Sequence, residues 1–177
     1  MKKLIVAALV FLGLTGVCQS SEAVLTREID LESNFCKVVT LVMTHPEVIG
    51  GEVIEQVPIK KGVALSPDKG LVWYSVTRNL ATTKGEDLWF KSHSVLNQNS
   101  LVILSKLDDE SDFLNQSEYL VEFHKKKDGG TLVKMTLTLD AEASPFFLRI
   151  GGRVTTIRTE RAIRTLIGEP LSKEKEE

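Results

Sequence analysis

Within the expected strand 131–140, residues 133–140 alternate between apolar and polar without a break, and this pattern limits the folds open to the chain. One set would lie on one face of a strand and the other set on the opposite face, because successive side chains in a strand point to opposite sides. The apolar set is Val133, Met135, Leu137 and Leu139, and the polar set is Lys134, Thr136 and Thr138. A strand with one buried and one wet face is typical of an antiparallel sheet.

Further strands are expected before this one. The segment Tyr119–Lys127 is joined to it through Lys127-Asp128-Gly129-Gly130, which is a hairpin signal because glycine adopts positive φ. Runs rich in β-branched and aromatic residues, separated by turn residues, predict the others. These are Thr26–Leu31, Glu52–Lys60, Leu71–Asn79, Asp87–Leu96 and Leu101–Leu107.

Two helices are expected. Ser33 can cap the first, whose apolar residues Phe35, Val38, Val39 and Val42 follow helical spacing up to His45-Pro46. Pro145 opens the second, which reaches about Ile167 and is closed by Gly168 and Pro170. Ile150, Val154 and Ile157 form one stripe of this helix, and Arg161 follows on the same stripe. The helix either bends near Gly151-Gly152 or packs its last turns on a different surface.

The first 20 residues differ from the rest and resemble a secretory signal peptide. Lys2 and Lys3 precede an apolar run from Leu4 to Val17, which is too short to span a membrane core. Cleavage is expected after Ser20 or after Ala23, which would give a periplasmic or secreted protein. An uncleaved anchor and a lipoprotein attached through Cys18 are the less favoured alternatives, the latter because Thr15 and Val17 match a lipobox poorly.

Composition excludes several classes of protein. The chain of 177 residues is 42% hydrophobic and 26% charged, with a net charge of −2, so it is neither disordered nor marked for nucleic acid. Cleavage after Ser20 removes two of the 22 basic residues and none of the 24 acidic ones, which makes the net charge −4. Cys36 would then be alone, without an internal disulfide, and its apolar neighbours predict a buried thiol.

The mature chain is expected to form one domain over residues 21–170, followed by a disordered charged tail over residues 171–177. The sequence contains no repeat and no linker that would mark a boundary. A monomer is expected, and a transient membrane contact is left open. The expected fold class is α+β, with a curved antiparallel sheet wrapped around the long C-terminal helix.

Several local strings resemble the START-related lipid-binding superfamily, whose helix-grip fold is shared with polyketide cyclases. The resemblance covers roughly Thr26 to Gly168. It is carried by the strings 26–31, 71–78, 129–133 and 139–148, which are TREIDL, LVWYSVTR, GGTLV and LDAEASPFFL. The chain departs from the family in lacking its Trp-Pro turn, and of its Arg-Asp pair only Asp87 matches. The resemblance implies a pocket for a hydrophobic ligand between the sheet and the C-terminal helix.

The residues expected to line this pocket are mostly aromatic or apolar, with two arginines. They are Trp73, Arg78, Trp89, Tyr119, Phe123, Met135, Phe147, Ile150, Val154 and Arg161. Which face of the Trp73 and Trp89 strands points inward is left open, because a slip of one residue would invert both. The arginines of the last helix could meet an anionic head group, but a solvated face is favoured.

No constellation of catalytic or metal-binding residues is visible in the sequence. Its three histidines lack metal-ligand spacing, and the acidic run 108–112 lacks the glycine of an EF-hand loop. There is no Gly-x-Ser-x-Gly and no phosphate-binding glycine loop. We therefore expect no cofactor, no metal and no enzyme activity.

The favoured function is an exported START-like binding protein that holds a lipid or another hydrophobic ligand, with transfer of that ligand as an extension. One alternative is a structural or interaction component of the cell envelope with a filled core. The other is a cyclase or hydrolase using the same cavity, for which Glu55, Asp87, His93 or Arg161 would have to converge.

Overall fold

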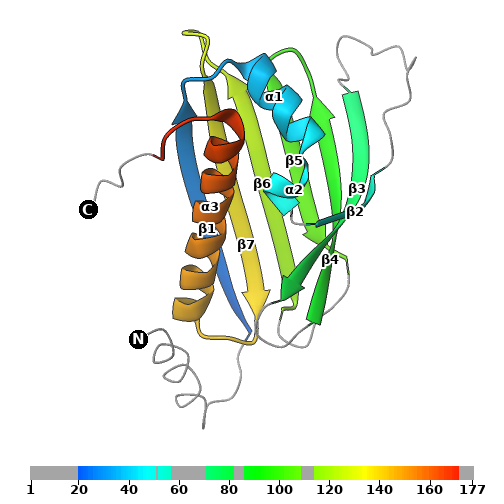
Figure 1. Cartoon of the computed structure of the whole chain (residues 1–177). Coiled ribbons are helices and arrows are strands. Elements are labelled where there is room, and N and C mark those ends of the chain that lie inside the picture. The colour runs from blue at the N-terminus through cyan, green and yellow to red at the C-terminus, as the bar shows by residue number, and fades with distance from the viewer. Residues whose placement is uncertain (1–19, 51, 57–70, 82–85, 109–113, 172–177) are drawn as a thin grey trace, which may run out of the picture.

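The computed structural model describes residues 20–50, 52–56, 71–81, 86–108 and 114–171, and for residues 50–88 it describes the backbone alone. A seven-stranded antiparallel sheet and helices on one of its faces make up this part of the chain (Figure 1). In chain order the elements are β1 (Ser21–Leu31), α1 (Phe35–Thr44), α2 (Glu47–Gly50), β2 (Glu52–Gln56), β3 (Leu71–Ala81), β4 (Glu86–Leu96), β5 (Ser100–Leu107), β6 (Gln116–Lys125), β7 (Thr131–Ala141) and α3 (Pro145–Ile167).

The strand order is β1-β7-β6-β5-β4-β3-β2, so the first strand of the chain lies beside the last. β1 and β7 pair along their whole length, from Ser21 opposite Ala141 to Leu31 opposite Thr131. The remaining strands are hairpin-connected neighbours, which agrees with the turn signals between them. The predicted α+β fold, a curved antiparallel sheet with a long C-terminal helix, is confirmed.

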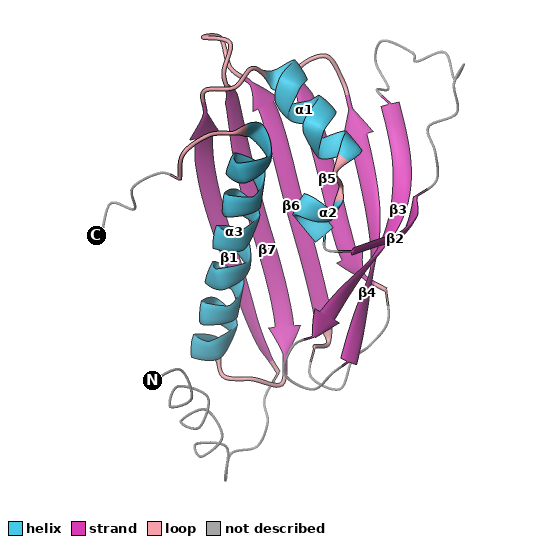
Figure 2. Ribbon diagram, viewed as in Figure 1, coloured by secondary structure: helices cyan, strands magenta, loops and turns pink. Residues whose placement is uncertain are grey.

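Helix α3 runs along β1 and β7, and α1 lies on the same side of the sheet near the C-terminal end of α3 (Figures 1 and 2). The predicted ends of α3 are confirmed: Pro145 stands in the first turn after Ser144, and Gly168 ends the helix at a φ of 78°. The amide of Gly168 donates to the carbonyl oxygens of Arg164 and Thr165, as expected of a left-handed cap.

The helix is continuous through its two glycines. Gly152 is buried, and a Cβ atom at this position would lie 2.3 Å from Cδ1 of Leu25 on β1. A Cβ atom at Gly151 would meet no other atom within 4 Å. Gly152 therefore lets α3 approach β1 closely, and the last turns pack on the same surface with Ile163 and Ile167 buried.

The core lies between the sheet and the helices. The alternation predicted for 131–140 is confirmed, since Val133, Met135 and Leu137 are buried. The same alternation holds along β5 and β6. From the helices, the buried side chains that complete this cluster are Phe35, Val38, Val39, Val42, Ile49, Ile163 and Ile167.

Three predictions from the first segment of the chain are corrected. β1 begins at Ser21 rather than Thr26. Residues 21–25 have little strand pattern of their own, but they are held in the strand by pairing with β7. The N-cap of α1 is Asn34 and not Ser33, since the Asn34 side chain accepts a hydrogen bond from the amide of Lys37. Cys36 is exposed rather than buried, because the buried face of α1 is that of Phe35 and Val38.

Some predictions fall outside the described residues. These are the leader over 1–19 with its Cys18, the end of the strand predicted over Glu52–Lys60, the turn at 66–70, most of the acidic run at 108–112 and the tail from residue 172. Within the described part of the chain, no helix is both long and apolar enough to cross a membrane.

Candidate ligand-binding face

The helix-covered side of the sheet, here called the inner face, is apolar at one end and polar in the middle. The apolar end holds Leu101, Phe123 and Val133 on three neighbouring strands. Toward the opposite end of the strands, small hydroxyl side chains take over on β4, β5 and β6. They are Ser92, Ser94, Ser105 and Ser117, and all of them are buried.

These serines differ in how their hydroxyls are satisfied. Ser92 and Ser105 face each other in register, and their Oγ atoms lie 2.7 Å apart. Ser94 is 2% exposed and Ser117 is 4% exposed. Neither of these two hydroxyls has a hydrogen-bond partner among the described residues. A buried hydroxyl without a partner costs roughly 1–3 kcal/mol, so both are positioned to bind a polar group.

Tyr119 extends this polar region toward α3. It lies opposite Ser105 in the sheet register, and its hydroxyl donates to Sδ of Met135 at 3.2 Å. Burial raises the pKa of Tyr119 to about 12, against a smaller opposing effect of its hydrogen bond with Thr159 on α3. The phenol is therefore protonated at neutral pH and can act as a hydrogen-bond donor on the inner face.

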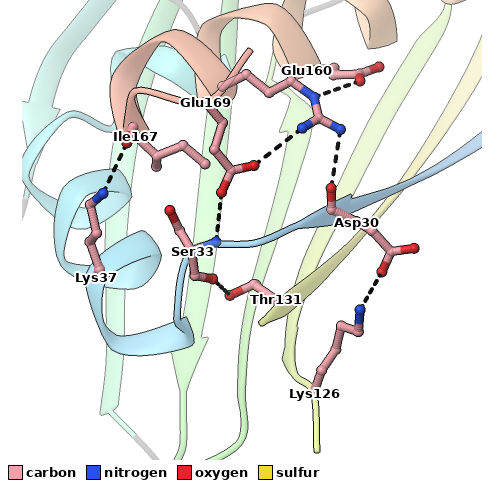
Figure 3. A network of polar contacts seen from close by, with 9 residues as sticks. Asp30, Ser33, Lys37, Lys126, Thr131, Glu160, Ile167 and Glu169 are labelled. Carbon is pink, nitrogen blue, oxygen red and sulfur yellow. Dashed lines mark hydrogen bonds and ion pairs between the residues drawn. The ribbon is translucent and has the colours of Figure 1, made fainter. Parts of the chain in front are cut away.

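A buried ion cluster fixes the C-terminal half of α3 to β1. The carboxylate of Glu160, itself 3% exposed, accepts hydrogen bonds from Nε of Arg27 at 2.7 Å and Nε of Arg164 at 3.0 Å. Arg164 also donates to the carbonyl oxygen of Asp30 at 3.1 Å and to Glu169 at 3.3 Å. Figure 3 shows Glu160 of α3, Asp30 of β1 and Glu169 after α3 around the guanidinium group that they share. The cluster holds the helix in place over the inner face.

The structure brings only some of the predicted pocket residues together. Tyr119, Phe123 and Met135 are buried on the inner face, where Tyr119 and Phe123 lie on either side of Val121, the residue opposite Met135. Trp89 lies on the other side of the sheet from its buried neighbour Phe90. Residues directly opposite each other on neighbouring strands lie on the same face of the sheet. Arg78 is opposite Trp89 and therefore belongs to the outer face, whereas Trp73 is opposite Ser94 and belongs to the inner face.

The predicted residues of α3 lie away from the sheet. Phe147, Ile150 and Val154 are exposed, and so is Arg161. The buried stripe of the helix is instead formed by Leu148, Gly152, Thr156, Thr159, Ile163 and Ile167. The arginines of α3 were expected to be solvated. This expectation is wrong for Arg164, which is buried in the ion cluster.

Of the catalytic constellation considered from the sequence, the two described members, His93 and Arg161, do not converge. His93 and Arg161 are exposed, on the outer side of β4 and of α3 respectively, while the Glu55 and Asp87 side chains lie outside the described part. Among the described residues, no group of histidine, cysteine or acidic side chains could hold a metal ion.

The buried serines and the ion cluster were not predicted from the sequence. The spacing of Ser92 and Ser94 by two residues on a strand places both on one face, which is a usable signal. Glu160 and Arg164 stand at the i, i+4 spacing of a helical ion pair. Arg27 could not be assigned to them, because its partner is distant in the sequence.

No protein-family model matches the sequence, and no curated protein matches it. Similarity is found among solved structures. The di-domain aromatase/cyclase StfQ of the steffimycin biosynthetic pathway is 11% identical, with a TM-score of 0.56, over 83% of this chain and 51% of StfQ. The chain thus spans about half the length of StfQ. The aromatase/cyclase Zhui from a Streptomyces species is 12% identical, with a TM-score of 0.50, over 84% of this chain and 93% of Zhui.

A third solved structure, a protein from Rhizobium leguminosarum, is 13% identical with a TM-score of 0.51, over 85% of this chain and 97% of that protein. At these identities the comparisons establish the fold. The chain has the helix-grip fold, which the resemblance in its sequence implied.

The prediction that the chain is not an enzyme is wrong. StfQ and Zhui, with which it shares its fold, are aromatase/cyclases, and a second di-domain aromatase/cyclase, BexL, also has this fold. The prediction rested on missing sequence motifs. Catalytic groups that converge from separate strands leave no such motif, because they are recognised by their geometry and not by their spacing in the chain.

Proposed function

We propose that this protein binds a mostly apolar small molecule or lipid on the inner face of the sheet, beside α3. The observation that carries the proposal is the change along the inner face from large apolar side chains to buried serines. Small side chains fill less space between sheet and helix than leucine or phenylalanine would, and a ligand site is typically apolar with a few polar groups that orient the ligand.

The polar groups indicate what kind of ligand fits. Tyr119 offers a protonated hydroxyl, and the hydroxyls of Ser94 and Ser117 lack protein partners among the described residues. A ligand with an apolar body and a few carbonyl or hydroxyl groups would satisfy them. The fold shared with StfQ and Zhui, which are both aromatase/cyclases, supports this choice of ligand.

The test is to enlarge the serine side chains. The protein is purified under mild conditions, and bound molecules are detected by native mass spectrometry and by extraction into organic solvent. The variant Ser94→Leu/Ser105→Leu should lose the bound mass and take up a fluorescent fatty acid at least tenfold more weakly. The control Thr136→Leu/Thr138→Leu makes the same kind of change on the outer face and should bind like the unaltered protein.

A milder variant guards against misfolding of the leucine variant. Ser94→Ala/Ser117→Ala keeps the volume small and should still bind an apolar probe. The proposal fails if the unaltered protein carries no ligand and takes up no probe, or if the leucine variant binds as well as the control does.

A second candidate function is conversion of the bound molecule, as in a cyclase. It is favoured by the shared fold with two aromatase/cyclases and by a buried, protonated phenol beside paired serine hydroxyls. Extracted ligand would be incubated with the protein and its products separated by mass. Tyr119→Phe should retain binding and lose conversion, whereas equal conversion by this variant would remove Tyr119 from any reaction.

A further inference from the structure

The N-terminal half of α3 carries large apolar side chains on its solvent side. Phe146 is 66% exposed, Phe147 is 42% exposed, Ile150 is 46% exposed and Val154 is 43% exposed. They share the helix surface turned away from the buried stripe that includes Leu148. The two phenylalanine rings contact each other edge to face, with their centroids 5.7 Å apart. Exposed apolar residues gathered in this way mark an interaction site more often than isolated ones do.

Arginines flank this apolar surface. Arg149 and Arg153 follow it on one side of the helix, Arg158 lies on the other side, and Arg161 continues it toward the C-terminus; all four are exposed. Among the described residues, none of them takes part in an ion pair. The only acidic residue in α3 is Glu160, which is buried against Arg27 and Arg164.

This apolar and basic surface, Phe146–Arg161, contrasts with the rest of the molecule. The whole chain has a net charge of −2, yet the exposed charges of α3 are all positive. A second copy of the chain would bring arginines against arginines, which disfavours self-association through this surface. A partner that offers both negative charge and an apolar interior fits both features.

We propose that the Phe146–Arg161 surface docks the protein on an anionic lipid membrane. A helix with phenylalanine and aliphatic side chains on one strip and arginines beside it can lie in the plane of the membrane interface. The apolar strip enters the boundary of the acyl chains, while the guanidinium groups meet lipid phosphates. This proposal is independent of the ligand proposed for the inner face.

The position of the chain's leader supports the choice of a membrane. β1 begins at Ser21, which pairs with Ala141, four residues before the start of α3. The apolar run Leu4–Val17 therefore joins the folded part at the same end of the molecule as Phe146. Before its cleavage, a leader held in a membrane would therefore place the Phe146–Arg161 surface beside that membrane.

Vesicle binding tests the proposal. The protein is purified after export from a bacterial host, its N-terminus is read by mass spectrometry, and it is sedimented with vesicles of phosphatidylglycerol and phosphatidylcholine. It should bind these vesicles, bind pure phosphatidylcholine vesicles at least tenfold more weakly, and be released by high salt.

Two variants separate the contributions. Phe146→Ser/Ile150→Ser/Val154→Ser should weaken binding at least tenfold, and Arg149→Gln/Arg153→Gln/Arg158→Gln should do the same. The matched controls are Val24→Ser, an exposed apolar residue on β1, and Lys91→Gln/Lys106→Gln/Lys127→Gln, which changes the net charge equally. Both controls should bind like the unaltered protein.

Three results would overturn the proposal. One is an unaltered protein that stays in the supernatant with phosphatidylglycerol vesicles. Another is equal loss of binding in the lysine control, since the net charge alone would then explain it. The third is a dimer in sedimentation velocity that the serine variant makes monomeric, which would identify a second copy as the occupant. Circular dichroism of every variant confirms that it is folded.

Discussion

At the scale of single residues, Tyr119 shows how burial selects one form of an ionisable group. Its side chain is 6% exposed and lies between Met135 and Thr159, where a phenolate would lose most of its hydration. The pKa is raised from 10.0 to about 12 for this reason. The same hydroxyl stays protonated well below pH 12, and it would donate to a ligand by exchanging its hydrogen bond to Met135 for one to the ligand.

This shift predicts a loss of stability at alkaline pH. Because the folded state keeps the proton to about pH 12 and the unfolded state loses it near pH 10, the stabilisation is complete below pH 10 and disappears as the pH rises to 12. The difference corresponds to roughly 2–3 kcal/mol. Urea unfolding at pH 9 and pH 12 should show this loss in the unaltered protein.

The control for this measurement is Tyr119→Phe. Lysines such as Lys134 titrate in the same range in both proteins, so the difference between the two pH dependences belongs to Tyr119. The variant should lose less stability between pH 9 and pH 12 than the unaltered protein does. Parallel pH dependences would contradict a raised pKa at this residue.

Single residues were also where sequence analysis failed most often. Cys36 has apolar neighbours in sequence but is exposed, because helical geometry places it on the opposite side from Val38. Ser94 is polar but is buried, because strand alternation and sheet register outweigh its own preference. Whether a side chain is buried is therefore not determined by its neighbours in the sequence. It is determined by the face of the helix or strand on which it lies and by the elements that pack on that face.

At the scale of elements, the ends of α3 were predictable and its orientation was not. Proline and glycine mark Pro145 and Gly168 through backbone geometry, which needs no tertiary information. The buried face was assigned to the stripe of Ile150 and Val154, yet the helix buries the stripe of Gly152 and Thr156. The buried stripe is less apolar than the exposed one, because the close approach of α3 to β1 requires a small residue at Gly152. Hydropathy alone therefore favours the wrong stripe.

The ion cluster predicts how strongly α3 is attached. Glu160→Gln removes the charge that Arg27 and Arg164 share, and leaves two guanidinium groups around a neutral amide. Breaking a buried pair in this way should cost about 2–4 kcal/mol of unfolding free energy, toward the lower end because Arg27 is partly exposed. Urea unfolding at neutral pH measures it.

Glu28→Gln is the matched control for that variant. Glu28 pairs with Lys134 at 2.9 Å on the surface, where both side chains are substantially exposed. An exposed pair contributes little to stability because water screens it, so this variant should remain close to the unaltered protein. If both variants lose the same stability, the cluster does not act as a buried attachment of α3.

At the scale of the whole molecule, the order of the elements was predictable and the pairing of the chain ends was not. Each hairpin follows from local turn signals, but β1 pairs with β7 across more than a hundred residues. That contact places the start of the folded chain beside α3. It also determines which processing of the leader is compatible with an intact fold.

We propose that the chain is exported and cleaved after Ser20. Ser21, Glu22 and Ala23 all pair with β7, and Ala23 is buried in a cluster with Leu148. Cleavage after Ala23 would remove these pairs and open that cluster, whereas cleavage after Ser20 leaves β1 whole. Intact-mass measurement of protein recovered from the periplasm or medium should therefore give a chain that begins at Ser21.

A chain made to begin at Val24 provides the comparison. It loses three residues of β1, and we expect a lower unfolding midpoint because the Ala23 position is left unfilled beside Leu148. A recovered mass that includes residues 1–20 would argue for an uncleaved anchor, and one that begins at Cys18 with added acyl chains would argue for a lipoprotein. In either case export by cleavage after Ser20 is wrong, and β1 is extended by residues that tether the Phe146 end of the molecule to the membrane.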